Sequence, residues 1–277
     1  MKNISKSWQE RIVPVMFITI TLLFIALFLV LPLASIFIEA SRGGIARYFS
    51  SFRDEYVRSA ISLTLLCAFV AVPMNVVFGI AAAWCITKFN FRGKNLLITL
   101  IDLPFSISPV IAGLVFVLAF GKSSALGSWI MEHGFEIIFA PPGIILATVF
   151  VTVPFVAREL IPLMEEQGTV EEEAAVALGA GGWSIFWRIT LPNIKWGLLY
   201  GVILCNARAM GEFGAVSVVS GHVRGAMTLP LQIEVLYNDY DTVSAFSVAT
   251  ILAGLALVTL VIKSLVEWKT KRQRGDN

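Results

Sequence analysis

The sequence has few charged residues for its length. Of its 277 residues, 14% are Asp, Glu, Lys or Arg, whereas a soluble globular domain carries roughly 25%. The mean hydropathy is +0.81. A charged side chain at the centre of a bilayer costs about 3 kcal/mol even on insertion-based scales, so a shortage of charge is what lipid demands. The composition argues against a separate soluble domain and predicts one transmembrane domain over residues 1–277.

Residues that bind metals or form disulfides are also scarce. Cys67, Cys85 and Cys205 lie inside apolar runs without a C-x-x-C spacing, so we expect free thiols and no metal site. The two histidines, His133 and His222, stand singly in polar connections, and we assign them no role. No Ser/His/Asp or metal-ligand cluster indicates catalysis, and no basic block is suited to nucleic acid. We therefore expect neither an enzyme nor a nucleic-acid-binding protein.

Long apolar segments account for most of the chain. A helix needs about 20 apolar residues to cross a bilayer. The first segment is longer than the apolar region of a signal peptide, about 7–15 residues, so we expect it to be a retained span. The sequence thus predicts an all-α integral membrane protein with about six transmembrane helices. The predicted spans are 12–38, 60–87, 96–120, 137–157, 196–220 and 243–262.

Lys and Arg are unevenly divided between the connections. If the N-terminus is cytoplasmic, 14 of the 21 basic residues fall on the cytoplasmic side and 7 on the outer side, where Arg208 is counted. Because cytoplasmic connections are enriched in Lys and Arg, we expect both termini in the cytoplasm. The first outer connection, with four arginines between Arg42 and Arg58, is an exception.

The longest connection, 158–195, is expected on the cytoplasmic side and contains helix signals. Thr169 and Glu172 have the spacing of a capping box, and the acidic run 171–173 fills a first turn, where the helix dipole favours acids. Gly179 is expected to end this helix. A second short helix should carry Trp183, Phe186 and Trp187 on one face and should end at Pro192.

An acidic surface helix fits poorly on an anionic lipid leaflet. We therefore expect these two helices to dock into a groove on a protein partner. Part of the connection also matches a known motif, EAA followed at fixed spacing by G and I-x-L-P. The matching residues are Glu173, Ala174, Ala175, Gly179, Ile189, Leu191 and Pro192.

This EAA motif resembles that of the permease subunits of binding-protein-dependent ATP-binding-cassette (ABC) importers. The resemblance implies a type I (MetI-like) permease fold, with 158–195 as a coupling loop that docks on an ATPase subunit. It implies that Glu173 makes polar contacts there, that Ala174 and Ala175 allow close approach, and that Gly179 permits the turn between the coupling helices.

Further runs are similar to the sulfate and molybdate group of these permeases, and most similar to its sulfate/thiosulfate branch. These runs are 88–93, 102–105 with 108–110, 154–160, 206–221 and 229–234. The resemblance implies an inner-membrane complex with a second, homologous permease, an ATPase dimer that binds ATP and Mg, and a periplasmic sulfate/thiosulfate-binding protein. Because such permeases share these runs more closely than they share cargo, a molybdate or tungstate permease is an alternative.

No ATP site is expected in this chain. Gly121, Lys122 and Ser123 match the end of a P-loop, but the first glycine of that motif would fall on Phe116. Energy for transport must then come from another subunit. The alternative from another class is a secondary transporter that couples anion entry to protons through Asp102 and Glu212.

Polar residues inside two predicted spans are the candidates for an anion path. Asp102, with two nearby prolines, indicates a broken helix, and Ser106 and Ser108 would offer hydroxyl donors there. Arg208 and Glu212 are four residues apart and share a helix face, so they can pair. The pair is either part of the anion path or its gate, or a structural ion pair between packed helices.

Overall fold

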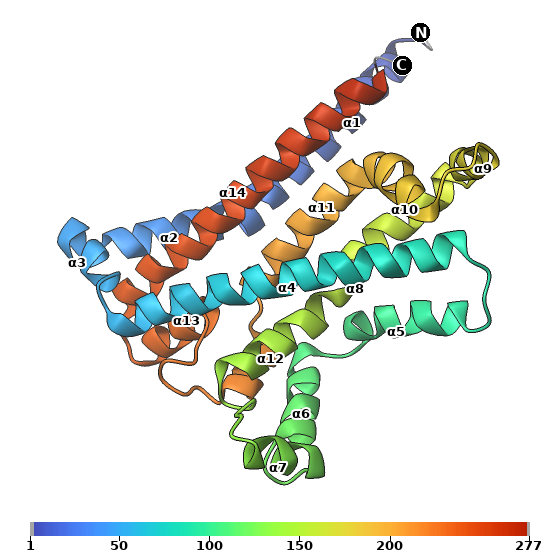
Figure 1. The fold of residues 1–277 in the computed structure, drawn as a ribbon. Coiled ribbons are helices and arrows are strands. Elements are labelled where there is room, and N and C mark those ends of the chain that lie inside the picture. Colours follow the sequence, from blue (N-terminus) through green and yellow to red (C-terminus); the bar gives the residue numbers. More distant parts are fainter. Residues whose placement is uncertain (1–2, 276–277) are drawn as a thin grey trace.

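The computed structural model describes residues 3–275, with the side chains of 13–265 and of Trp268. Every described regular element is a helix (Figure 1). The helices are α1 (Asn3–Ile25), η1 (Ala26–Val30), α2 (Leu31–Ser41), α3 (Gly44–Ser51), α4 (Glu55–Lys88), α5 (Lys94–Ser106), α6 (Pro109–Phe120), α7 (Ala125–Glu132), α8 (Pro141–Gln167), α9 (Val170–Ala177), α10 (Gly182–Ile185), η2 (Phe186–Thr190), α11 (Leu191–Met210), α12 (Gly214–Ser220), α13 (Leu229–Asn238) and α14 (Thr242–Gly275).

The predicted apolar segments correspond to four continuous helices and two bent pairs. The continuous helices long and apolar enough to cross a membrane are Val13–Ser41, Glu55–Lys88, Pro141–Gln167 and Thr242–Leu265. The α5–α6 pair bends by 106°, and the helix from Gly182 to Met210 bends by 46° into α12. If each pair is one span, up to six spans result, which agrees with the prediction of about six transmembrane helices.

The helices extend beyond several predicted ends. The structure carries α8 on to Gln167, so the connection predicted at 158–195 is mostly helical. The orientation of the termini stays a prediction from the sequence. Several of the basic residues on which that prediction depends lie outside the described side chains. These are Lys2, Lys6, Arg11, Lys269, Lys271, Arg272 and Arg274.

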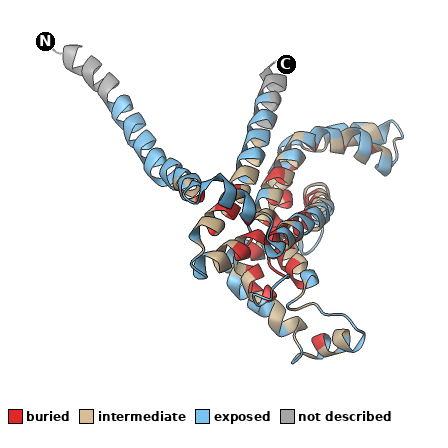
Figure 2. Cartoon of the chain, turned by 90° about the vertical axis from the view of Figure 1, so that its left-hand side faces the viewer, coloured by how far each residue is buried: buried red, intermediate tan, exposed pale blue. Residues whose placement is uncertain are grey.

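The first half of the first span stands apart from the body of the molecule. In Figure 2 the helix from Val13 to Val30 projects away with its side chains exposed, whereas the buried residues gather in the central bundle. Exposed residues on several sides of this helix, such as Phe17, Phe24 and Leu29, are apolar. A helix that is apolar all round is suited to lipid or to a neighbouring subunit.

The centre of the bundle is the crossing of α4, α8 and α11. A Cβ at Gly79 of α4 would lie 2.7 Å from the Cβ of Val156 and 3.0 Å from the backbone nitrogen of Ala157, so the two backbones approach closely. Asn75, which is buried, donates from Nδ2 to Thr152 Oγ1 at 2.7 Å and to the Val149 carbonyl at 3.2 Å. Small residues and interhelical hydrogen bonds are what hold helices together in lipid, where the hydrophobic effect contributes little.

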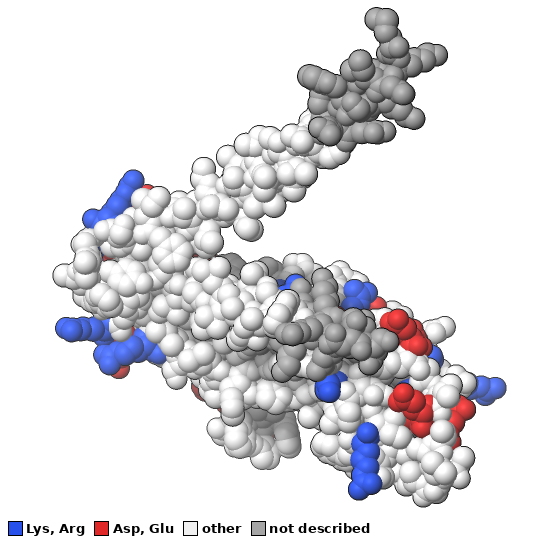
Figure 3. Space-filling model, turned by 90° about the horizontal axis from the view of Figure 1, so that it is seen from above, with Lys and Arg blue, Asp and Glu red and all other residues white. Residues whose placement is uncertain are grey.

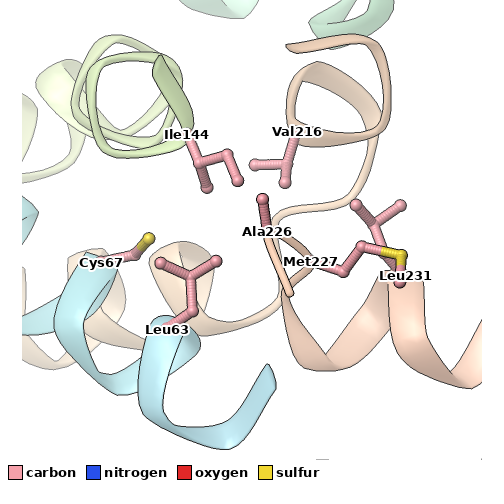
Figure 4. Close-up of a cluster of buried hydrophobic side chains, with 7 residues drawn as sticks. All are labelled: Leu63, Cys67, Ile144, Val216, Ala226, Met227 and Leu231. Atoms are coloured by element: carbon pink, nitrogen blue, oxygen red, sulfur yellow. The ribbon is translucent and has the colours of Figure 1, made fainter. Parts of the chain in front are cut away.

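A second cluster joins the two halves of the chain. Seven buried residues from α4, α8, α12, the loop before α13, and α13 meet there (Figure 4). They are Leu63, Cys67, Ile144, Val216, Ala226, Met227 and Leu231. The cluster fixes α12, and with it the broken end of α11, against the long helices.

Charged side chains gather at the two ends of the bundle. Figure 3 shows mainly basic side chains at the α3 end, and acidic and basic side chains together at the α9 end. At the α3 end, Arg47 pairs with Asp241 at 3.0 Å, and Tyr48 shares a 2.8 Å hydrogen bond with Thr250. The hydrogen bond that Asp241 receives from Ser244, together with Arg47, holds the pKa of the Asp241 carboxyl below its usual value. These contacts attach α3 to the beginning of α14.

The close crossing at Gly79 predicts a stability effect. We expect Gly79→Ala to destabilise the protein by about 1–3 kcal/mol, because the added methyl group must push Val156 and the α8 backbone away. Gly254→Ala in α14 is the matched control, since no atom lies within 4 Å of its added Cβ. Thermal unfolding of the detergent-solubilised protein measures the difference. Equal midpoints for the two variants would contradict this packing.

Candidate functional site

The acidic helix α9 begins at Thr169, but the capping box predicted there is absent. Thr169 donates from Oγ1 to Glu173 Oε1 at 2.6 Å and caps no backbone N–H. Glu172, the expected capping partner, lies half-buried and points to other helices. The acidic residues 171–173 do fill the first turn of α9, where the dipole favours negative charge.

Gly179 ends α9 with the hydrogen bonds of a Schellman motif. The Gly179 N–H donates to the Val176 carbonyl and the Ala180 N–H donates to the Ala175 carbonyl, each at 2.9 Å. Gly179 has φ = +83°, in the left-handed region that favours glycine. The chain therefore turns at this residue, between α9 and the next helix, as the sequence indicates.

The second short helix predicted in the coupling loop is not separate. The helix that starts at Gly182 runs through η2 into α11 and is continuous to Met210. Pro192 does not end it, because η2 is a π-helical turn in which the Leu191 N–H donates to the Phe186 carbonyl five residues back. The wider turn changes the hydrogen-bond register just before the proline, whose ring would otherwise clash with the preceding turn. The same arrangement occurs before Pro32, where the Leu31 N–H donates to the Ala26 carbonyl.

The outer side of α9 and α10 carries large exposed apolar side chains. Leu178 is 89% exposed, Trp183 76% and Val176 61%, and Ala174 is exposed beside them. Exposed apolar residues of this size, grouped together, are typical of a contact site for another molecule. We call this set the coupling surface: Val170, Ala174, Val176, Leu178, Trp183 and Trp187.

The remaining motif residues lie around or beneath this surface. Ala175 and Ile189 are half-buried, and Glu173 and Pro192 are exposed. Leu191 packs against the buried cluster of α4, α8 and α11 that includes Ile194. Leu191 therefore attaches the loop to the bundle, whereas Glu173 and Ala174 face outward.

Sequence reasoning missed the residues that hold α9 in place. Lys88, the last residue of α4, forms an ion pair with Glu172 at 2.9 Å and also donates to the Gly168 carbonyl. Asn193 of α11 donates from its side chain to Glu171. A lysine ending an apolar run and a glutamate in an acidic run could be noticed, but their separation by 84 positions gives no spacing signal.

The break between α5 and α6 adjoins the break between α11 and α12. Ser106 and Ser108 are exposed at the first break, and Pro109 begins α6 there. A Cβ at Gly214, the first residue of α12, would lie 3.0 Å from the Cβ of Pro109. The structure thus brings the start of α6, beside Ser108, next to the segment that follows Glu212.

Arg208 and Glu212 form the predicted ion pair across the second break. Arg208 Nη2 lies 2.7 Å from Glu212 Oε2, and Glu212 is 1% exposed whereas the Arg208 side chain is 34% exposed. The other carboxylate oxygen of Glu212 accepts a 2.9 Å hydrogen bond from the Ala215 N–H in the first turn of α12. Glu212 therefore connects the end of α11 to the start of α12.

Asp102 belongs to a different ion pair. Arg158 of α8 binds it through two hydrogen bonds, Nε to Oδ1 at 2.8 Å and Nη2 to Oδ2 at 3.2 Å. The same guanidinium lies over the Phe105 ring, 5.0 Å from its centroid. A cavity of about 350 Å³ opens beside the pair, lined also by Ile98 and Ile161. The charged candidates for the path thus belong to two separate ion pairs, Asp102 with Arg158 near the first break and Arg208 with Glu212 at the second, while Ser106 and Ser108 lie at the first break.

Comparisons with known proteins identify the same family as the motif. The family model described as the binding-protein-dependent transport system inner membrane component matches residues 75–275. The chain is 51% identical to the sulfate transport system permease protein CysW of Escherichia coli (strain K12), over 92% of this chain and 88% of the relative. It is 49% identical to CysW of Synechocystis sp. (strain ATCC 27184 / PCC 6803 / Kazusa), over 99% and 98%.

A more distant relative and a solved structure extend the comparison. The sulfate transport system permease protein CysT of Escherichia coli (strain K12) is 35% identical over 87% of each chain. A bacterial ABC transporter for import of the polysaccharide alginate superposes with a TM-score of 0.78 at 18% identity, covering 98% of this chain and 99% of that chain. The predicted all-α permease fold and the family resemblance are confirmed. The chain belongs to the binding-protein-dependent transport system inner membrane components, a family of multi-pass permeases.

Proposed function

We propose that this chain is the permease subunit of an ABC importer that carries sulfate or thiosulfate across the inner membrane. The observation that carries the proposal is the coupling surface, where exposed apolar residues lie on an acidic helix in the EAA position. The two CysW relatives, at 51% and 49% identity over nearly the whole chain, support sulfate as the cargo. ATP and Mg would be bound by a partner ATPase dimer, with none in this chain.

Two further partners complete the proposed complex. Escherichia coli (strain K12) has two different proteins described as sulfate transport system permeases, CysW and CysT, and this chain resembles both. That supports pairing with a second, homologous permease and not with a copy of this chain. A periplasmic sulfate/thiosulfate-binding protein would deliver the anion at the α3 end, with both termini and α9 in the cytoplasm. The related alginate importer has been solved with its periplasmic protein bound.

The proposed cycle follows from linked two-state behaviour. ATP binding closes the ATPase dimer and moves α9, and the permease pair opens outward to receive the anion. Hydrolysis then resets the pair to its inward-open state. Each ligand shifts the equilibrium only by its different affinity for the two states.

The secondary-transporter alternative is weakened by the ion pairs. A proton carrier needs a carboxylate that can be protonated and released, whereas Asp102 and Glu212 each lie against an arginine. The molybdate or tungstate alternative uses the same architecture and differs in cargo alone.

Energy source and cargo can be tested together. We expect uptake of labelled sulfate by proteoliposomes holding the full complex to require internal ATP and to survive an uncoupler. Unlabelled thiosulfate should compete with sulfate, and molybdate should compete far less. Uptake that collapses with the uncoupler and persists without ATP would contradict the proposal, and stronger competition by molybdate would reassign the cargo.

The turn at Gly179 provides a test of the coupling loop. Gly179→Pro removes the hydrogen bond to Val176 and cannot adopt the positive φ, so we expect uptake to fall by about tenfold or more while the protein stays in the membrane. Gly181→Ala is the control, because Gly181 has φ = −76° and no atom near its added Cβ. Glu173→Lys should also reduce uptake. Normal ATP-dependent uptake by Gly179→Pro would refute the coupling role.

The Arg208–Glu212 pair is proposed as a structural link that holds the second break, and not as an anion ligand. Arg208→Ala leaves the buried Glu212 carboxylate unpaired, which costs about 3–5 kcal/mol. Arg208→Ala/Glu212→Ala should therefore be more stable than Arg208→Ala alone and should recover part of its sulfate uptake. Thermal unfolding and uptake of both variants measure this. If the double variant is destabilised by the sum of the losses measured for Arg208→Ala and Glu212→Ala alone, the two side chains are not coupled.

A further inference from the structure

One carboxylate joins the coupling helix to the transmembrane bundle. Glu172 lies on the side of α9 that faces the bundle, and its side chain is 19% exposed. Lys88 at the end of α4 is the partner, with its side chain 8% exposed and its Nζ 2.9 Å from Glu172 Oε1. Lys88 also donates to the carbonyl of Gly168, in the connection between α8 and α9. A single ammonium group therefore contacts the end of α8 and the start of α9.

The carboxylate of Glu172 is also bound from a second direction. Thr190, which is 2% exposed, donates from Oγ1 to Glu172 Oε1 at 3.2 Å. Thr190 is the last residue of the π-helical turn η2, directly before α11. The Lys88–Glu172–Thr190 cluster thus joins α9 to α4 and to α11, two of the helices that cross at the centre of the bundle.

Neighbouring contacts support the cluster from one side. Asn193 of α11 donates to Glu171, and Gln167 at the end of α8 donates to the Asn193 carbonyl at 3.1 Å. On the side of α9 away from Glu172, Val170 and Ala174 of the coupling surface are by contrast exposed. The inner side of α9 is therefore attached to the bundle by polar contacts, and its outer side is available to a partner.

A helix of eight residues cannot hold its own position or shape. If α9 moves with a docked ATPase, its movement is transmitted to the bundle only through contacts that persist while α9 moves. A largely buried, hydrogen-bonded ion pair provides such a contact, because separating the two charges would leave each without its charged partner in a site that is largely closed to water. Coupling between distant sites requires a continuous physical connection of this kind or an equivalent two-state element.

We propose that Lys88 is a positioning residue for transport, and that its ion pair with Glu172 transmits the movement of α9 to α4 and α11. This inference rests on the proposed function, since it assumes an ATPase docked on the coupling surface. Lys88 lies outside the EAA motif and beneath the coupling surface, so it acts through Glu172 and not by touching the ATPase.

The test measures sulfate transported per ATP hydrolysed, in proteoliposomes that hold the complete transporter and its binding protein. In Lys88→Glu and Glu172→Lys we expect the ATPase to remain bound and active while this ratio falls by about tenfold or more, because like charges now face each other. In the exchanged double variant, Lys88→Glu/Glu172→Lys, the ratio should return to within about threefold of wild type. A residue needed only for folding would lower the amount of assembled complex, and not the ratio.

Glu166→Lys is the matched control. Glu166 is exposed on the last turn of α8 and has no ion pair among the described residues, so the same change of charge should leave the ratio unaltered. If the reversed variants do not assemble, Lys88→Arg replaces them, because it keeps the charge but places a larger, planar group in a site that is nearly closed. We expect Lys88→Arg to lower the ratio as well.

The outcomes separate this inference from the proposed function. The role of the ion pair would be overturned if Lys88→Glu or Lys88→Arg left the amount of sulfate transported per ATP unchanged. It would also be overturned if the exchanged double variant transported no more sulfate per ATP than Glu172→Lys. A lack of ATP-driven sulfate uptake by the wild-type complex would instead contradict the proposed function itself.

Discussion

A charge in a membrane protein is stabilised by a partner of opposite charge, and in this chain three ion pairs lie where helices end or bend. Three carboxylates in or beside the bundle, Asp102, Glu172 and Glu212, each lie against a basic side chain. Each pair also lies near an interruption of helix: before the bend of α5 into α6, between α8 and α9, and between α11 and α12. Continuous helices satisfy their own backbone and need no such pairs. These three ion pairs thus lie where the backbone is irregular, whereas Asn75 and Thr152 form a hydrogen bond between continuous helices.

The sequence predicts well what depends on local pattern. Apolar length identifies the helices that can cross a membrane, and Gly179 ends α9 because an αL position favours glycine. It predicts poorly what depends on partners distant in the chain. Thr169 and Glu172 have the capping-box spacing, yet Lys88 binds Glu172 instead, and Asp102 is held by Arg158. A proline normally indicates a helix end, but the π-helical turn before Pro192 lets the helix continue. The residue pattern does not predict that turn.

These features divide the molecule into three parts: the α9 end, the packed centre and the two broken helix pairs. The α9 end carries both acidic and basic side chains (Figure 3), with an exposed apolar surface on the outer side of α9 and polar contacts on its inner side. The centre, where Gly79 and Asn75 bring α4 and α8 together, is tightly packed. A tightly packed centre moves as a unit when one end is displaced. The two broken helix pairs, which adjoin at Pro109 and Gly214, are then the places where a rigid-body movement could open and close a path.

The central claim is that a partner ATPase binds the outer side of α9. Hydrogen–deuterium exchange of the backbone amides, measured on the permease pair with and without its ATPase subunits, tests this directly. The account predicts that amides in α9 and α10 become protected when the ATPase is present, while those in α3 and α13 at the other end change little. Unchanged exchange in α9 on formation of a stable permease–ATPase complex would contradict it.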